Sequence, residues 1–97
     1  MKLNWGYVME FEWDPEKARR NHTKHKVTFE EAVTVFYDPL SATFDDPHHS
    51  IGERRLITIG LSSTGRLLVV SHTEKGKALR IISARSATAQ ERKRHEN

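Results

Sequence analysis

The first third of the chain carries two helical patterns of hydrophobic and polar residues, and they differ in character. In the first, Asp14-Pro15-Glu16 supplies an N-cap, a first-turn proline and an acidic first turn, so a helix is expected from about Pro15 to His25. Few residues of this segment are apolar, and Arg19, Arg20 and Lys24 make it cationic. The pattern predicts a basic helix that is only weakly buried.

The second helical pattern is the better candidate for the core. Thr28-Phe29-Glu30-Glu31 has the form of a capping box, and apolar residues follow Phe29 at i+3, i+4 and i+7. Pro39 biases the residue before it away from helical geometry. A helix is therefore expected from Phe29 to about Tyr37.

Short runs rich in aromatic and β-branched residues predict the strands of a sheet. One run, Glu10–Trp13, leads directly into the first helix, whereas the polar stretch Leu40–Ser50 shows no strand pattern. Residues 1–9 are either an extra edge strand or a leader before an internal start. Three further strands are expected downstream, at Arg54–Ser62, Leu67–Thr73 and Leu79–Arg85.

The connections between these strands indicate how they pair. Ser63-Thr64-Gly65 and Glu74-Lys75-Gly76-Lys77 are short and contain glycine, which suits hairpins and therefore an antiparallel meander. Thr88-Ala89-Gln90-Glu91 is a second capping box, which opens a terminal basic helix from Ala89 to about His95. A strand, two helices, a meander and a final helix make an α+β pattern, with helices gathered on an antiparallel sheet.

Side-chain alternation along the last strand separates two of its cations. Arg80 and Arg85 are five residues apart, so a period of two sends them to opposite faces of the sheet. Only one of the two is then expected in any given cleft, unless a bulge intervenes.

Composition narrows the class of protein. The chain has 97 residues, of which 36% are hydrophobic, so it is expected to form one domain with a thin core and modest stability. It has no cysteine, which excludes disulfides and thiolate metal sites. Neither a signal-peptide core nor a stretch near the ~20 apolar residues of a membrane span is present, so a soluble cytoplasmic protein is expected.

The net charge of +3 is unevenly placed along the chain. From Lys75 to Asn97 there are seven basic and two acidic residues, a local net charge of +5. Such a patch favours a polyanion through phosphate contacts and counterion release, although from charge alone a solvated, charged helix end is the favoured interpretation.

A set of short fragments runs in order along almost the whole chain: Phe11-Glu12-Trp13-Asp14-Pro15, Lys17, Asn21, Lys24-His25, Val27-Thr28-Phe29-Glu30-Glu31-Ala32, Asp38-Pro39, Glu53-Arg54, Gly60-Leu61-Ser62, Gly65-Arg66-Leu67-Leu68-Val69-Val70, His72-Thr73, Arg80-Ile81-Ile82-Ser83-Ala84-Arg85-Ser86-Ala87 and Glu91-Arg92. This ordered set resembles the BrnT family of toxins. The resemblance implies a RelE-like fold in the order β-α-α-β-β-β-β-α, and RNA cleavage that arrests translation. It also implies a cognate DNA-binding antitoxin of the BrnA type, in a heterotetramer or larger assembly. Lys26 departs from the family, which commonly has glycine there.

Metal-free RNA cleavage requires a deprotonated 2′-hydroxyl, a stabilised phosphorane and a protonated leaving oxygen. Arginine can hold two phosphate oxygens with its planar fork, whereas lysine supplies a compact charge. Arg85 is therefore expected to stabilise the phosphorane, and Lys24 to stabilise the 2′-oxyanion or act as the base. No metal or other cofactor is expected.

Histidine exchanges a proton near neutral pH, which makes His25 and His72 candidates for proton transfer. A hydrogen-bonded structural role is the alternative for both, and His72 could simply pair across the meander. Glu53 could be a general base or orient Lys24, and Arg54 beside it could bind phosphate. A structural ion pair is an equal alternative for these two.

Three further features have a structural and a functional interpretation each. Arg80 could bind RNA or anchor the sheet to Asp14 or another carboxylate, and the structural role is favoured. Trp13 could stack on a base, although core packing is the usual role in a domain this small. Asp45-Asp46-Pro47-His48-His49 offers metal-ligand types, but its spacing matches no helical ligand pair and an exposed loop is expected.

Two other classes of function compete with the ribonuclease interpretation. A nucleic-acid-binding module without catalysis would use the same basic residues, and purified protein that binds but does not cleave RNA would identify it. A pure interaction protein whose thin core is completed by a partner would show no affinity for nucleic acid.

Overall fold

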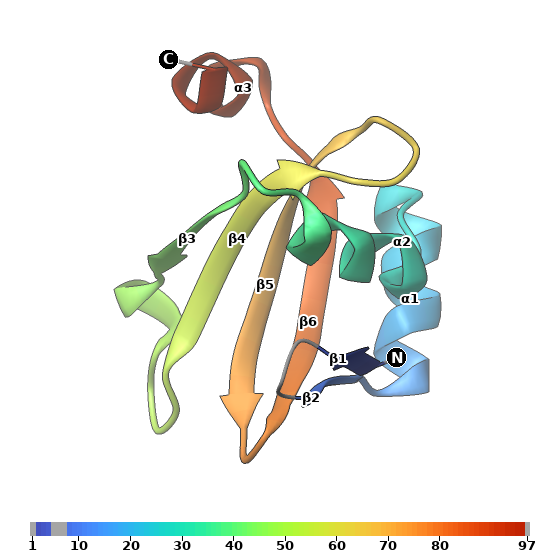
Figure 1. Cartoon of the computed structure of the whole chain (residues 1–97), viewed down its shortest axis with the longest axis vertical. Coiled ribbons are helices and arrows are strands. Elements are labelled where there is room, and N and C mark those ends of the chain that lie inside the picture. The colour runs from blue at the N-terminus through green and yellow to red at the C-terminus, as the bar shows by residue number, and fades with distance from the viewer. Residues whose placement is uncertain (1, 5–7, 97) are drawn as a thin grey trace.

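A strand, two helices, four strands and a final helix follow one another, in the order that the resemblance implies, in a computed structural model that describes residues 2–4 and 8–96 (Figure 1). The α+β class and the element order are confirmed, with one more strand at the N-terminus. The elements are β1 (Lys2–Asn4), β2 (Val8–Glu12), α1 (Pro15–His25), α2 (Phe29–Thr34) with a 3-10 turn (Val35–Tyr37), β3 (Ala42–Asp45), a 3-10 turn (Pro47–His49), β4 (Arg55–Leu61), β5 (Leu67–Lys75), β6 (Ala78–Ser86) and α3 (Ala89–Glu96).

The strands form one six-stranded sheet in the order β1-β2-β6-β5-β4-β3. The meander β4-β5-β6 is antiparallel as expected, and β1 and β3 also join antiparallel neighbours. One pair differs, because β2 lies parallel to β6, with Glu12 opposite Arg80. Residues 1 and 5–7, on which part of the leader hypothesis falls, lie outside the described residues.

The polar stretch from residue 40 to 50, which shows no strand pattern, contains β3, the first of the four strands that the implied order places after the two helices. Its four residues pair with β4, from Ala42 opposite Ile59 to Asp45 opposite Leu56. β3 is a short edge strand whose residues are half-buried or exposed, so it lacks the hydrophobic run that reveals a central strand.

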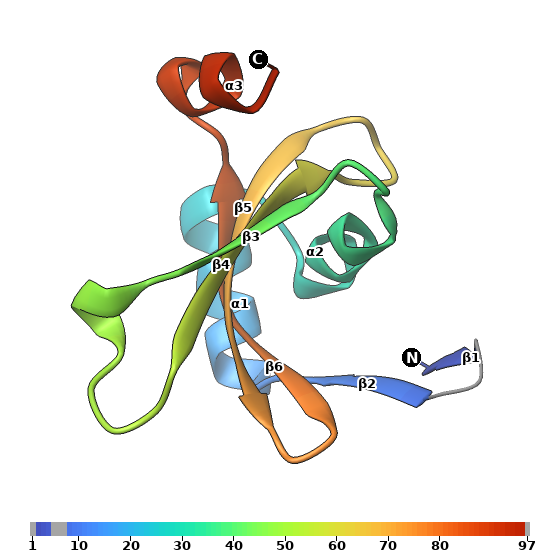
Figure 2. The same cartoon turned by 60° about the vertical axis from the view of Figure 1, so that its left-hand side comes forward.

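One face of the sheet carries the main core. Val27, Phe29, Ala32 and Val35, from α2 and the residues beside it, pack on side chains of β5 and β6. Seen nearly edge-on in Figure 2, the sheet has α2 on one side only. The opposite side of the sheet has a smaller apolar cluster, formed by Ile59, Leu67 and Val69.

A buried asparagine attaches α1 to the edge of β6. The Asn21 side chain, 7% exposed, donates from Nδ2 to the carbonyl oxygens of Ala84 (2.8 Å) and Val27 (3.0 Å). Its Oδ1 accepts from the amide of Ala84 at 3.1 Å. β2 ends opposite Arg80, so farther along β6 the Asn21 amide takes the place of a neighbouring strand.

A bulge in β6 overturns the expected alternation of its two arginines. Ser71 of β5 lies opposite Ser83, but the next residue, His72, lies opposite Ile81, so Ile82 is an extra residue. The extra residue reverses the alternation, and Arg80 and Arg85 therefore lie on the same face of the sheet rather than on opposite faces.

Lys26, which stands where the resembling family commonly has glycine, ends α1 in a left-handed conformation. Lys26 is the C-cap of α1 and has φ +60° and ψ 31°, in the left-handed region that favours glycine. Its amide donates to the carbonyl of His22 at 2.9 Å, and its carbonyl accepts from Arg66 at 3.0 Å. The turn that glycine usually makes in the resembling family is thus formed here by a lysine.

Candidate functional site on the open face of the sheet

The face opposite α2 gathers most of the cations that the sheet contributes. Because side chains alternate along a strand, the buried Leu68, Val70 and His72 of β5 point toward α2, and the residues between them point the other way. Residues paired across strands share a face. This open face therefore comprises Ala42 and Phe44 of β3, Arg55, Ile57 and Ile59 of β4, Val69, Ser71 and Thr73 of β5, and Arg80, Ser83 and Arg85 of β6.

Arg55 is a cation of this face that was not among the candidate residues expected from the sequence. It lies opposite Thr73, as does Arg80 on the other side of β5, so the two arginines are two strand spacings apart, roughly 10 Å between Cα atoms. Within the described residues its guanidinium has no hydrogen bond or ion pair. Alternation with Ile57 and Ile59 was the signal that could have identified it.

Arg80 makes the structural contact that was favoured for it, and its partner is Glu12 rather than Asp14. Its Nε lies 3.4 Å from Oε1 of Glu12, the residue opposite it on β2. Asp14 instead caps α1, where its Oδ1 accepts from the amide of Glu16 at 3.2 Å. The Arg80 side chain remains 40% exposed, so it can also reach a ligand on the open face.

Arg85 is held by a bidentate ion pair with the last helix. Its Nη1 and Nη2 donate to Oε1 and Oε2 of Glu91 at 2.8 and 3.0 Å. Hydrogen bonds from Arg85, assisted by the amide of Thr88, lower the pKa of Glu91 to about 2. No residue of α3 is buried in the part of that helix that the structure describes, so this pair is a main attachment of α3 to the sheet.

Lys24 and His25 are placed near Arg85 by the asparagine that precedes them. Asn21 binds Ala84, the neighbour of Arg85, and Lys24 lies one helical turn beyond Asn21 along α1. Lys24 is exposed and His25 is half-buried. α1 therefore brings an exposed ammonium group and an imidazole alongside the C-terminal half of β6.

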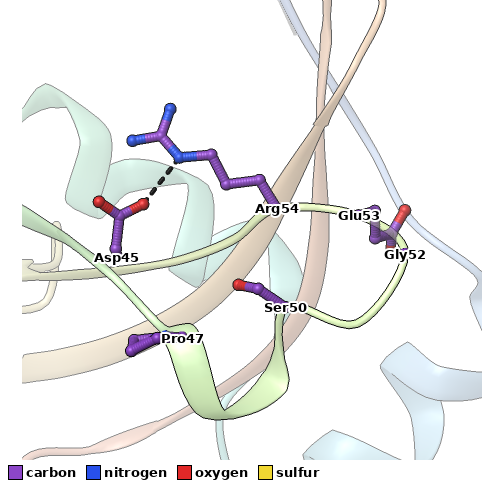
Figure 3. A pocket seen from close by; sticks show the side chains of 6 residues that line it. All are labelled: Asp45, Pro47, Ser50, Gly52, Glu53 and Arg54. Carbon is purple, nitrogen blue, oxygen red and sulfur yellow. Dashed lines mark hydrogen bonds and ion pairs between the residues drawn. The ribbon is translucent and has the colours of Figure 1, made fainter.

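Glu53 and Arg54 lie elsewhere, on the loop before β4. The strand begins at Arg55 rather than Arg54, and β5 and β6 separate β4 from α1 (Figure 1), so Glu53 does not orient Lys24. Figure 3 shows Arg54 reaching toward Asp45, with Nε 2.7 Å from Oδ1, while Glu53 lies away from this pair. For Arg54, the ion-pair alternative is the one that the structure shows.

Trp13 belongs to the core. Its ring meets that of Phe29 edge to face, with centroids 5.9 Å apart, and it packs against the main cluster of buried residues. The geometry supports core packing rather than stacking on a base.

His72 is also a core residue and not a surface group. It is 3% exposed and faces α2, where the ring of Phe36 meets it edge to face at 5.0 Å. Its Nε2 pairs with Oγ1 of Thr58 at 2.7 Å, across the meander, and its buried Nδ1 has no hydrogen-bond partner among residues 2–4 and 8–96. Burial lowers the pKa of His72 to about 4. A histidine in this position does not contact RNA.

This buried histidine makes stability depend on pH. Because the pKa of His72 is lower in the folded state than its ordinary 6.5, the unfolded chain binds the extra proton as pH falls from 6.5 to about 4. The free energy of unfolding should drop by about 3 kcal/mol across that window. Urea unfolding at several pH values measures the slope. His72→Gln should flatten it, whereas a slope unchanged from wild type, or flattened equally by His49→Gln on the exposed loop, would contradict the assignment.

No metal site forms among residues 2–4 and 8–96, where His, Asp and Glu nowhere gather in a group of three or more. In the stretch from Asp45 to His49, Nδ1 of His49 binds Oδ2 of Asp46 at 2.9 Å. None of the described helices is long and apolar enough to span a membrane.

Comparisons with known proteins place this arrangement in context. A family model described as the ribonuclease toxin BrnT of type II toxin–antitoxin systems matches residues 13–91. A search of solved structures finds the 1.1 Å crystal structure of the ribonuclease toxin BrnT from Brucella abortus, with a TM-score of 0.66 and 26% sequence identity, over 82% of this chain and 97% of that one. No curated protein sequence matches. The region matched by the family model includes α1, strands β3 to β6 and the Arg85–Glu91 pair.

Proposed function

Because the chain belongs to the BrnT family of ribonuclease toxins of type II toxin–antitoxin systems, we propose that it cleaves RNA at the open face without a metal and thereby inhibits translation. One observation supports this location for the active site: the bulge at Ile82 brings Arg80 and Arg85 to the same face of the sheet, together with Arg55. Family membership favours a ribonuclease over the two non-catalytic alternatives.

In the proposed mechanism, the two cations nearest the C-terminal half of β6 act on the reacting phosphate. The planar guanidinium of Arg85 binds two non-bridging oxygens and stabilises the phosphorane. Lys24 stabilises the developing 2′-oxyanion or removes the proton of the 2′-hydroxyl, and His25 donates a proton to the leaving 5′-oxygen. Arg80 and Arg55, some distance along the same face, hold flanking phosphates.

The ion pair with Glu91 sets a condition on this mechanism. Both Nη atoms of Arg85 donate to the Glu91 carboxylate, so a phosphate that binds this edge of the guanidinium must displace that carboxylate, whereas Nε makes no hydrogen bond among the described residues. Two oxygens of a tetrahedral phosphate, like the two of a carboxylate, can accept from two N–H groups of one guanidinium, so the exchange replaces one charge-assisted pair by another.

The partner proposed for this toxin is a DNA-binding antitoxin of the BrnA type, in a heterotetramer or larger assembly. Membership of a type II toxin family implies an antitoxin. The basic open face and the basic α3 suit an acidic partner, which would neutralise the ribonuclease in its own cell.

The absence of a metal step is tested by cleavage in a chelator. Purified protein should cut single-stranded RNA at an unchanged rate in excess EDTA and leave 2′,3′-cyclic phosphate ends, because the proposed site supplies cations and proton carriers from its own side chains. End analysis of the fragments and parallel reactions with Mg²⁺ provide the measurement. Activity that depends strictly on Mg²⁺ would instead direct attention to the acidic loop before β4.

A further inference from the structure

A second feature of the open face is an apolar groove at the β3 side, which adjoins Arg85 because Val69 lies opposite Arg85 and Glu91 is its ion-pair partner. Ile57 and Ile59 of β4 and Val69 of β5 form its floor, and Phe44 of β3 forms one side. Glu91, Arg94 and His95 of α3 form the other side, and the groove encloses about 370 Å³. Phe44 remains 57% exposed.

None of the described residues fills this groove. α3 stands beyond the ends of the strands rather than across the sheet (Figures 1 and 2), and it contributes no buried residue among those described. An aromatic side chain that is more than half exposed beside branched aliphatic residues is typical of a surface that binds another protein.

The α3 side of the groove is cationic. The Glu91 carboxylate is occupied by Arg85 and by the amide of Thr88, so it does not neutralise Arg94. Within the described residues, Arg94 has no ion pair, and Lys93 beside it is exposed. A ligand of this groove therefore meets apolar residues on the floor and positive charge along one side.

We propose that this groove binds an amphipathic segment of the antitoxin, which inserts large apolar side chains between Phe44 and α3, over Ile57, and sets a carboxylate against Arg94. The inference rests on the antitoxin partnership proposed above and names the surface that serves it. A segment seated there lies on the same sheet face as Arg55, Arg80 and Arg85, within two strands of them, and so obstructs RNA that approaches those arginines.

Two other occupants fit the groove less well. A nucleobase would place the polar atoms of its edge against Ile57, Ile59 and Val69, which offer no hydrogen-bond partner. A second copy of the chain would bring two cationic α3 helices together, and their like charges would repel.

The test compares two groove variants with two matched controls. Phe44→Ser removes the exposed aromatic side chain and Arg94→Glu reverses the charge on α3, while Ile51→Ser (Ile51 is 92% exposed on the loop before β4) and Lys77→Glu change the same residue classes elsewhere. Each purified chain is titrated with the protein encoded by the adjacent reading frame. RNA cleavage, oligomeric state and thermal unfolding are measured on the same samples without that protein.

We expect Phe44→Ser to weaken binding of the antitoxin at least about tenfold. Arg94→Glu should slow association about tenfold and reduce its dependence on salt. Both controls should bind within about twofold of wild type. All four variants should cleave RNA as wild type does, and their unfolding temperatures should show that the fold is kept.

Each contrary result has a distinct meaning. Tight binding that neither groove variant weakens would overturn the groove while leaving the antitoxin partnership intact. Loss of RNA cleavage with unchanged antitoxin affinity would make the groove an RNA site. Reduced self-association of the isolated chain, with unchanged antitoxin affinity, would make it a dimer interface. A neighbouring gene product that does not bind the wild-type chain would overturn the partnership itself and the groove with it.

Discussion

Arg85→Ala is expected to lower the rate of RNA cleavage by about a hundred- to a thousand-fold, the usual cost of losing one group that stabilises charge in a transition state. The substitution removes the cation proposed to bind the phosphorane and leaves Arg55 and Arg80 to hold flanking phosphates. Single-turnover cleavage of a labelled RNA measures the loss, and RNA affinity should fall far less than the rate. Circular dichroism and thermal unfolding show whether the fold is retained.

The Arg85–Glu91 pair makes a control necessary. Arg85→Ala also detaches α3 from β6, so a loss of activity could arise from a displaced helix. Glu91→Gln weakens the same attachment but keeps the guanidinium, and it frees Arg85 for phosphate. We therefore expect Glu91→Gln to cleave RNA at least as fast as wild type. If it loses as much activity as Arg85→Ala, the role of Arg85 is structural.

Lys24→Ala tests the other half of the proposed mechanism with the same assay. Lys24 is exposed and makes no hydrogen bond or ion pair within the part of the chain that the structure describes, so its loss should leave stability unchanged while cleavage falls by a comparable factor. Lys17→Ala, two turns earlier on the same side of α1, is the matched control. Full activity of Lys24→Ala would remove Lys24 from the mechanism.

Sequence reasoning succeeded where the determinants are local. The capping box Thr88–Glu91 forms as expected, with the Glu91 amide donating to the Thr88 hydroxyl at 3.1 Å and the Thr88 amide donating to the Glu91 carboxylate at 2.9 Å. The Thr28 hydroxyl likewise accepts from the Glu31 amide at 3.0 Å, but the Glu31 carboxylate binds Arg66 instead of the Thr28 amide, so this box is half formed. A cap joins groups within three residues of one another, so the identity of the residues nearly specifies the contact. The β4-β5-β6 meander was equally accessible, because glycine-containing turns connect neighbouring segments.

The candidate site depended on contacts between distant segments, which local patterns do not contain. The bulge at Ile82 is visible only in the pairing of β5 with β6, and it changes the face on which Arg80 lies. The expected strand began at Arg54, one residue before the observed start of β4 at Arg55. Neighbouring residues of a strand point to opposite faces, so this difference of one residue decides which arginine is assigned to the open face. The partner of Arg85 is likewise set by where α3 begins relative to the end of β6.

Asn21 is the clearest case of a residue whose importance only the structure reveals, and Asn21→Asp is expected to lower the free energy of unfolding by about 3 to 4 kcal/mol at pH 7. The substitution is almost isosteric. It keeps an acceptor for the amide of Ala84, but it replaces the Nδ2 donor by a charged oxygen facing the carbonyls of Val27 and Ala84. A loss of this size is a large share of the 5 to 15 kcal/mol that holds a typical domain together.

The pH dependence of this loss identifies its cause. Protonation of the introduced carboxyl restores one donor and removes the buried charge, so the penalty should shrink as pH falls toward 4. Urea unfolding of wild type and variant at several pH values measures it. His22→Asp introduces the same charge at the adjacent exposed position of α1 and should cost only about 1 kcal/mol or less. If Asn21→Asp costs no more than this control, the amide does not hold α1 to β6, and the placement of Lys24 beside Arg85 loses its structural basis.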